Sequence, residues 1–227
     1  MKLKKPKFWD YKKPNIISLL LFPLTILIRI NNFLNHYKKN INNKFQSYKI
    51  KTICIGNIYL GGTGKTPIAI KINEILKILK YKTVFIKKYY SESLDEYRLL
   101  KKYGSVISDN KRIVSLNKAN KDNEIAIFDD GLQDSSINYD LKLVCFNTSN
   151  FIGNGMLLPA GPLREKISSL KKYDAVFLNG NDERIDEITS VIKRYNNNIK
   201  IFNSTYVLID LDILDKQNID PVKIVAH

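Results

Sequence analysis

The sequence predicts an α/β fold in which helices flank a mostly parallel sheet, preceded by a basic and apolar helical arm at the N-terminus. From residue 52 onward, short runs rich in β-branched and aromatic residues alternate with helix-period segments. This alternation is typical of strands buried on both faces of an open parallel sheet. One such run leads into a glycine-rich turn, and another ends in two consecutive acids. We therefore expect a ligand site at the carboxyl ends of the strands.

Composition limits the size and compartment of this fold. A chain of 227 residues with 44% hydrophobic content can bury one core, or one core and a small lobe. Cys54 and Cys145 both lie inside apolar runs without metal-ligand spacing, so we expect small core residues in a reducing compartment. The chain has only 2 histidines, which excludes a histidine-rich metal site.

The N-terminal arm combines charge with an apolar block. Residues 1–51 carry 12 Lys/Arg against the single acid Asp10, whereas the rest of the chain is nearly balanced. The apolar run 16–28 would reach about 20 Å as a helix, too short for a hydrocarbon core of about 30 Å, and Pro23 would bend it. We interpret the arm as a monotopic segment in a membrane interface, with its lysines on anionic headgroups.

Two other interpretations of the arm stay open. A pair of ordinary buried core helices would also contain apolar runs of this length. Nucleic-acid binding ranks lower, because the lysines flank an apolar block instead of interleaving with exposed aromatic residues.

Strands and helices are expected in regular alternation after the arm. The six strand-like runs are residues 52–55, 83–86, 124–128, 141–146, 175–178 and 200–202. Helical periodicity covers residues 68–80 and 184–195, and more weakly 94–103. The tail from residue 204 contains two further strand-like runs, 206–209 and 222–225, and it ends on an apolar stretch.

The glycine-rich turn at residues 57–67 is a phosphate-binding candidate. Glycine lets backbone N–H groups close around phosphate oxygens, Lys65 offers a charge to the β- and γ-phosphates, and the Thr66 hydroxyl can ligate Mg²⁺. The first glycine of the usual motif is missing, because Tyr59 stands at its position. A flexible turn that binds no phosphate is the alternative interpretation. We predict a P-loop NTPase-like fold whose nucleotide contacts are Tyr59, Leu60, Gly61, Gly62, Thr63, Gly64, Lys65 and Thr66.

Acidic residues at strand ends supply the remaining chemistry. Asp129 and Asp130 follow an apolar run, where a P-loop protein holds Mg²⁺; one acid could bind metal while the other orients a neighbour. On their own they could equally cap a turn at Gly131. A base for an acceptor hydroxyl could be any one of several acids, and spacing does not choose among them: Asp95, Glu96, Asp134 or Asp140.

Taken together, these segments resemble the lipid A 4′-kinase (tetraacyldisaccharide 4′-kinase) family, whose phosphate loop also lacks the first glycine. The matching segments follow family order and are Phe8-Trp9, residues 56–67, Asp129-Asp130-Gly131-Leu132-Gln133, residues 153–165 and residues 175–180.

The resemblance implies transfer of the ATP γ-phosphate to the 4′-hydroxyl of a tetraacylated disaccharide 1-phosphate, the lipid A precursor. Mg²⁺ would lie on Thr66 with Asp129 or Asp130, and the catalytic residues would be Lys65, Asp130 and the base Asp95. Substrate contacts are expected from the proline–glycine loop, at Asn154 and Arg164, although Arg164 could instead pair with Glu165.

The same resemblance implies an organisation and a location. We expect the membrane arm at 1–51, the P-loop kinase domain at 52–204 and the start of a shortened C-terminal lobe at 205–227. The protein would be a monomer on the cytoplasmic face of the bacterial inner membrane, with no nucleic-acid partner.

The chain departs from the family at several positions. Ser-Arg-Gly-Tyr-Gly is replaced by Lys87-Lys88-Tyr89-Tyr90-Ser91, and Asp134 stands where a histidine is usual. The chain also ends before the family's Gly-Ile-x-Asn-Pro and Asp-His-His motifs, which would impair activity. Two alternatives therefore stay open: a membrane-bound nucleotide-binding remnant without kinase activity, or a soluble P-loop ATPase with another substrate.

Overall fold

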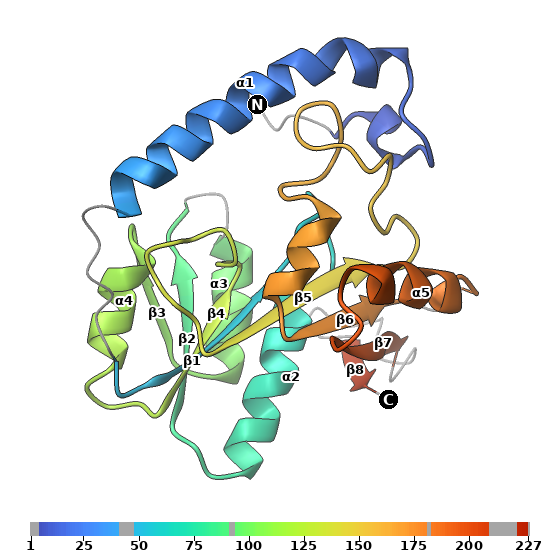
Figure 1. The fold of residues 1–227 in the computed structure, drawn as a ribbon. Coiled ribbons are helices and arrows are strands. Elements are labelled where there is room, and N and C mark those ends of the chain that lie inside the picture. Colours follow the sequence, from blue (N-terminus) through green and yellow to red (C-terminus); the bar gives the residue numbers. More distant parts are fainter. Residues whose placement is uncertain (1–4, 41–47, 91–93, 181–182, 209–221, 227) are drawn as a thin grey trace.

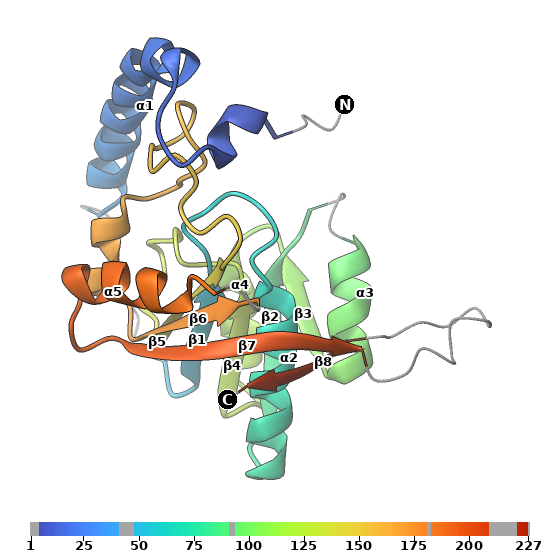
Figure 2. The ribbon, with the colours of Figure 1, turned by 90° about the vertical axis from the view of Figure 1, so that its right-hand side faces the viewer.

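The protein, seen in a computed structural model, is built on one eight-stranded sheet of order β3-β2-β4-β1-β5-β6-β7-β8 (Figures 1 and 2). The structure describes residues 5–40, 48–90, 94–180, 183–208 and 222–226. All neighbouring strands pair parallel except β7 and β8, which are antiparallel. The strands are β1 (Lys51–Gly56), β2 (Thr83–Lys88), β3 (Val106–Asp109), β4 (Ile125–Asp129), β5 (Leu141–Asn147), β6 (Ala175–Asn179), β7 (Lys200–Leu208) and β8 (Val222–Ala226).

Helices follow most of these strands, as the alternation predicts. They are α1 (Ile16–Asn40), α2 (Lys65–Ile78), α3 (Leu94–Tyr103), α4 (Arg112–Ala119) and α5 (Ile185–Tyr195), with the 3₁₀-helices η1 (Lys7–Asp10) and η3 (Ile167–Lys172). The predicted α/β class and its six strands are confirmed. Helix α2 begins at Lys65, earlier than the predicted residue 68, because a proline such as Pro67 is tolerated in the first turn of a helix.

Two elements were not expected from the sequence, and one strand crosses residue 204, the end of the expected kinase domain. Strand β3 and helix α4 were not predicted: β3 lies at the sheet edge and is only half-buried, and α4 has just 8 residues. Strand β7 runs continuously across residue 204, so a lobe boundary there would cut a strand, and β8 belongs to the same sheet. Residue 209, the end of one predicted strand, lies outside the described residues.

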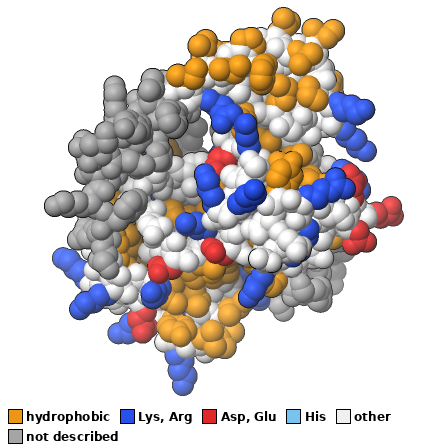
Figure 3. Space-filling view, in the orientation of Figure 1, with side chains coloured by type: hydrophobic (Ala, Val, Ile, Leu, Met, Phe, Trp, Pro, Cys, Tyr) orange, Lys and Arg blue, Asp and Glu red, His pale blue; other side chains and the backbone are white. Residues whose placement is uncertain are grey.

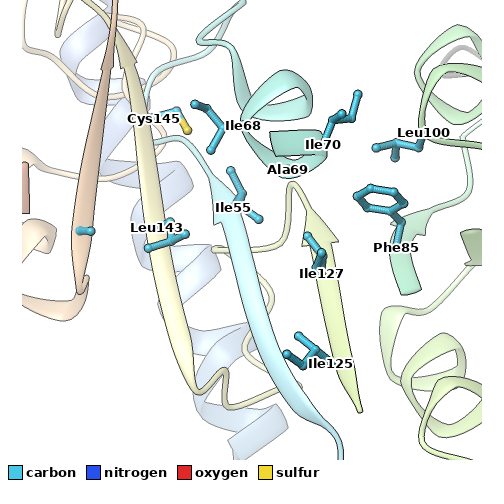
Figure 4. Packing of buried hydrophobic residues seen from close by; sticks show 11 residues of the cluster. Ile55, Ile68, Ala69, Ile70, Phe85, Leu100, Ile125, Ile127, Leu143 and Cys145 are labelled. Atoms are coloured by element: carbon cyan, nitrogen blue, oxygen red, sulfur yellow. The ribbon is translucent and has the colours of Figure 1, made fainter. Parts of the chain in front are cut away.

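The core has two layers because successive side chains of a strand face opposite sides of the sheet. Ile55, Phe85 and Ile127 pack on one face against α2 and α3, as Figure 4 shows. Cys54 and Phe128, one position away, face the other side, which is covered by α4. Helices α5 and η3 cover that side farther along the sheet. Helices therefore cover both faces around β1, β2 and β4, which leaves the strand ends as the place for a site.

Helix α1 turns its polar side chains inward and its apolar ones outward. Ser18 and Thr25 are buried against the body, whereas Ile16, Leu20 and Leu27 are 76%, 75% and 64% exposed. Figure 3 shows these apolar side chains gathered over α1, away from the rest of the molecule. The alternative of ordinary buried core helices is therefore wrong for this segment. Helical structure also continues through Pro23.

Within the part of the chain that the structure describes, none of the helices is long and apolar enough to cross a bilayer.

The arm is held to the body by the loop at residues 153–165, which lies between α1 and the sheet (Figure 1). The indole of Trp9 donates to the carbonyl of Pro159 at 3.1 Å, and the amide of Asn154 donates to the carbonyl of Trp9 at 2.9 Å. Gly153 has a φ of +55°, and a Cβ there would lie 2.1 Å from the Trp9 carbonyl oxygen. Only glycine allows this close approach of the two backbones.

Asp140 stabilises the start of the sheet in a pH-dependent way. Its carboxylate accepts from the hydroxyl and the amide of Thr52 at 2.7 Å and 2.9 Å. Burial acts to raise the pKa of Asp140, but these hydrogen bonds outweigh it and hold the pKa below the ordinary value. A lowered pKa in the folded state stabilises the fold above the ordinary pKa, and the contribution is lost as pH falls through the lower value.

We expect Thr52→Val to lower the free energy of unfolding by about 1 kcal/mol at pH 7, and by less at a pH low enough to protonate Asp140 in the folded protein. Urea unfolding of both proteins at the two pH values measures this difference. Thr83→Val is the matched control, because Thr83 donates to the neutral amide oxygen of Asn73 at 2.6 Å and its loss should not depend on pH. A Thr52→Val effect of equal size at both pH values would contradict the assignment.

Candidate nucleotide site at the carboxyl ends of the strands

Sheet order brings the glycine-rich turn and the acid pair together. Strands β1 and β4 are neighbours with Ile55 opposite Asp129, so the turn after β1 and the acids after β4 share one edge. The Thr66 hydroxyl, in the first turn of α2, donates to Oδ2 of Asp129 at 3.0 Å. Thr66 is 9% and Asp129 1% exposed. The predicted association of these two residues is therefore present in the structure.

The conformation of the glycine turn leaves its backbone open to close approach by a ligand. Gly64 precedes α2 in the left-handed region, at φ +77°, and Gly61 has a φ of +148°. Lys65 then begins the helix, so its free N–H groups and positive dipole end point toward the strand edge. The surrounding protein holds the turn from outside: Leu60 donates its amide to Pro162 at 2.8 Å, and the side-chain amide of Asn179 donates to the Thr63 carbonyl.

Tyr59, at the place of the missing first glycine, serves the N-terminal segment. Its side chain is buried, its hydroxyl donates to Asp10, and Lys5 donates to that hydroxyl. Lys5 and Asp10 also pair at 2.5 Å. The backbone of Tyr59 forms a bridge with Leu163. Tyr59 was expected among the nucleotide contacts, but its hydroxyl is engaged by the N-terminal segment, while its ring lies beside Gly61.

Asp130 adopts a strained backbone conformation at the edge of the site. It has a φ of +65°, and its amide donates to the Ile55 carbonyl at 2.8 Å. Its carboxylate accepts from the Arg164 guanidinium at 3.0 Å and 3.2 Å. Arg164 does not pair with Glu165, because Glu165 accepts from Gln133 at 2.9 Å and from the Tyr173 hydroxyl at 3.0 Å. Arg164 therefore forms its ion pair with Asp130, across the site, instead of with Glu165.

Arg112 joins the same edge from α4. It donates to the carbonyl of Asp130 and lies 3.3 Å from the carboxylate of Asp134. Burial acts to raise the pKa of Asp134, but hydrogen bonds from Ser136, with the Arg112 charge, hold it below the ordinary value. Asp134 is therefore a stable carboxylate that orients Arg112, and it is not poised to act as a base near neutral pH.

Sequence reasoning missed Lys87, at the carboxyl end of β2. Lys87 is 5% exposed, and its ammonium lies 2.6 Å from Oδ2 of Asp129 and 2.6 Å from the carboxylate of Glu96. Burial acts to lower the pKa of Lys87, but the two carboxylates outweigh it and raise the pKa. The available signal was a lysine in an otherwise apolar strand, directly before the point where a parallel strand reaches the site.

Asp95 is not brought to this cluster. Its side chain is 97% exposed, and it lies 4.0 Å from Arg98 on the same helix. Consecutive residues of a helix point about 100° apart, so the start of α3 can present only one of its two acids to Lys87. Glu96 takes that place.

An open cleft of about 1120 Å³ connects the site to α1. Ile28 and Arg29 of α1 line one side, and Asp130 lines the other. The basic side chains along the cleft are Arg29, Lys88, Arg112, Arg164, Lys166 and Lys172. A phosphorylated ligand that also contacts α1 would fit this charge distribution.

Asn154, expected as a substrate contact, is buried and does not line that cleft. It is 5% exposed, and its side-chain amide donates to the Ser18 hydroxyl at 2.9 Å and to the Ala160 carbonyl at 3.1 Å. Its amide oxygen accepts from Met156 at 3.0 Å. Both ends of the side chain are used inside the protein, so Asn154 positions α1 against the loop.

The parallel sheet, the glycine turn that begins a helix with Lys-Thr, and the acid-tipped neighbouring strand define a P-loop NTPase fold. The family model for tetraacyldisaccharide-1-P 4′-kinase matches residues 17–105 and 95–226. The chain belongs to this family, which is a family of kinases.

Similar proteins agree with this membership. The chain is 54% identical to a tetraacyldisaccharide 4′-kinase of Pelagibacter ubique, covering 95% of this chain and 68% of the relative. It is 32% identical to a tetraacyldisaccharide 4′-kinase of Rickettsia africae, covering 98% and 70%. A crystal structure of LpxK from Aquifex aeolicus in complex with ATP has the same fold, with a TM-score of 0.67 at 22% identity over 85% of this chain and 66% of that one. The chain thus spans about two thirds of the length of these proteins.

Proposed function

We propose that this chain is an ATP-dependent kinase that phosphorylates the 4′-hydroxyl of tetraacyldisaccharide 1-phosphate, the lipid A precursor. The observation that carries the proposal is the contact between Thr66 and Asp129 beneath the glycine turn. The next residue, Asp130, lines a basic cleft that extends to α1. Family membership supports the choice of substrate.

ATP would bind with its phosphates on the glycine turn. The N–H groups at the start of α2 face the β- and γ-phosphates, and Lys65 supplies the adjacent positive charge. A solved protein of the same fold is in complex with ATP, which supports ATP as the nucleotide. Gly61 and Gly64 allow the backbone to approach the phosphates without a Cβ in the way.

Thr66 and Asp129 are the residues that would hold Mg²⁺. Oδ1 of Asp129 is buried and has no hydrogen-bond partner among the described residues, which is the state expected of an oxygen that a metal ligates. Hydroxyl and carboxylate oxygens suit Mg²⁺, which usually combines one or two protein ligands with substrate phosphates and water. When bound, the metal would neutralise charge on the β- and γ-phosphate oxygens.

Arg164 and Asp130 would position the acceptor end of the cleft. Their ion pair lines the cleft, and in this proposal it would present a cation and a carboxylate to the sugar hydroxyl as it approaches the phosphate. Asp95, the base that the resemblance implies, would have to turn toward the cleft, because its carboxylate is exposed in this structure. Removal of the hydroxyl proton therefore depends on a rearrangement of the first turn of α3.

The outward apolar face of α1 would lie in the membrane interface. Its large exposed side chains have no partner among the described residues, and the buried ones are the small polar Ser18 and Thr25. An acylated substrate could keep its chains in the lipid while its phosphorylated sugars enter the basic cleft beside Arg29. Because ATP is cytoplasmic, we place the protein on the cytoplasmic face of the inner membrane.

A phosphate-transfer assay tests the proposal. The purified chain is given γ-labelled ATP, Mg²⁺ and the disaccharide lipid in detergent micelles, and label is expected in the lipid. ATP binding without transfer would favour the nucleotide-binding remnant. Hydrolysis of ATP that is independent of the lipid, by a chain that does not float with vesicles, would favour the soluble ATPase.

A further inference from the structure

Asp129 is already paired with a cationic side chain of the protein, Lys87. The ammonium of Lys87 lies 2.6 Å from Oδ2 of Asp129, and the side chains are 6% and 0% exposed. Thr66 donates to the same oxygen at 3.0 Å. A buried ion pair of this kind needs both charges, because removal of one leaves the other uncompensated.

The location of this pair matters for a nucleotide. Asp129 lies directly beneath the turn that would hold the triphosphate, so without a cation its charge would repel the phosphates. At an effective dielectric constant near 20, two unit charges about 6 Å apart interact strongly enough to change a binding constant by about 100-fold. Mg²⁺ normally removes this repulsion. Lys87 can remove it as well, since its charge is held against Asp129 before any ligand arrives.

Glu96 holds Lys87 in place from the other side. Its carboxylate lies 2.6 Å from the Lys87 ammonium, and its side chain is 57% exposed, so this contact is at the rim while the contact with Asp129 is inside. The ammonium is therefore fixed between the end of β4 and the first turn of α3. It is positioned by protein groups on both sides and does not depend on a ligand for its location.

We propose that Lys87 is a built-in counter-cation of Asp129, which allows this chain to bind a nucleoside triphosphate without a divalent metal. The inference rests on the proposed nucleotide site. It makes Lys87 a positioning residue, because it acts through Asp129. The proposal also predicts that Lys87 and a divalent metal compete for the Asp129 carboxylate when no nucleotide is present, because Lys87 already contacts one of its oxygens.

ATP affinity, measured by calorimetry with Mg²⁺ and again with EDTA, tests the proposal. We expect the wild-type Kd in EDTA to lie within about 10-fold of its Kd in Mg²⁺. Lys87→Gln keeps a hydrogen-bond donor and loses the charge, so its Kd in EDTA should rise by about 100-fold while its Kd in Mg²⁺ changes little. Lys87→Arg should restore the wild-type ratio. Lys101→Gln, an exposed lysine of α3, is the control for net charge.

A second measurement does not need the nucleotide. Mn²⁺ binding to the nucleotide-free chain, followed by electron paramagnetic resonance, should be at least about 10-fold tighter in Lys87→Gln than in the wild type, because the competing ammonium is gone. Unchanged Mn²⁺ affinity would overturn the inference even if the kinase proposal holds. So would an ATP affinity that falls equally with and without Mg²⁺, which indicates a structural role alone.

The wild-type protein by itself can also refute the idea. A Kd that worsens by 100-fold or more in EDTA would overturn it without any variant, which matters if Lys87→Gln fails to fold. Absence of ATP binding under both conditions would overturn the nucleotide site together with this inference.

Discussion

Replacing Lys65 by alanine is expected to abolish transfer of phosphate to the lipid, with a loss of about 1000-fold or more. Lys65 is the first residue of α2, directly after Gly64, so its charge belongs at the β- and γ-phosphates. Charge develops there during transfer, and no other described cation begins that helix. The assay is the initial rate of label transfer from ATP at saturating lipid.

Lys71→Ala is the matched control for this experiment. Lys71 lies on the same helix and pairs with Glu74 at 3.3 Å, at a distance from the glycine turn. Its replacement should leave the rate within about twofold, since exposed ion pairs contribute little. If Lys65→Ala retained a tenth of the wild-type rate, the assignment of the glycine turn as the phosphate site would be wrong.

The second large effect is expected for membrane binding. The double variant Leu20→Asp and Leu27→Asp places two charges on the outward face of α1, where the side chains are 75% and 64% exposed. Because burial of one leucine contributes roughly 1.5–3 kcal/mol, we expect vesicle affinity to fall by about 100-fold or more. Flotation with vesicles that contain anionic lipid measures the bound fraction.

A charge-matched control tests whether the face matters. Ile78 and Leu79, at the far end of α2, are 78% and 60% exposed, so Ile78→Asp with Leu79→Asp adds the same charges to a different surface (Figure 1). That variant should float like the wild type. Equal loss of flotation in both double variants would indicate general electrostatic repulsion and would contradict the role of α1. Because the α1 positions are exposed in the free protein, neither pair should change the unfolding midpoint strongly.

Much of the fold could be predicted because the strands are short, apolar and buried on both faces. Such runs stand out from the sequence, as does the glycine turn that separates β1 from α2. Strand β3 and α4 could not be recognised in this way, since an edge strand is half-buried and an eight-residue helix shows little more than two turns of periodicity. The continuity of β7 across residue 204 was not visible in the sequence for a related reason: it depends on pairing with β6 and β8.

Some residues of the candidate site could likewise be predicted from the sequence, and others could not. Lys65, Thr66, Asp129 and Asp130 could be predicted, because a local backbone motif and a strand end place them, and parallel strands bring their carboxyl ends together. The partners of these residues depend on side chains that are distant in sequence. Lys87 of β2 contacts Asp129 of the neighbouring strand β4. Arg164 contacts Asp130 from a loop 34 positions further along the chain.

The sequence alone was therefore enough for the α/β class, the glycine turn, the acid pair and the basic apolar arm, because each is a contiguous pattern whose physical meaning does not depend on distant residues. Packing determined the rest. It turned Glu96 and not Asp95 toward Lys87, assigned Asn154 and Tyr59 to the arm, and left the apolar face of α1 outward. These outcomes follow from which side chains share space after folding, a property that local spacing does not contain.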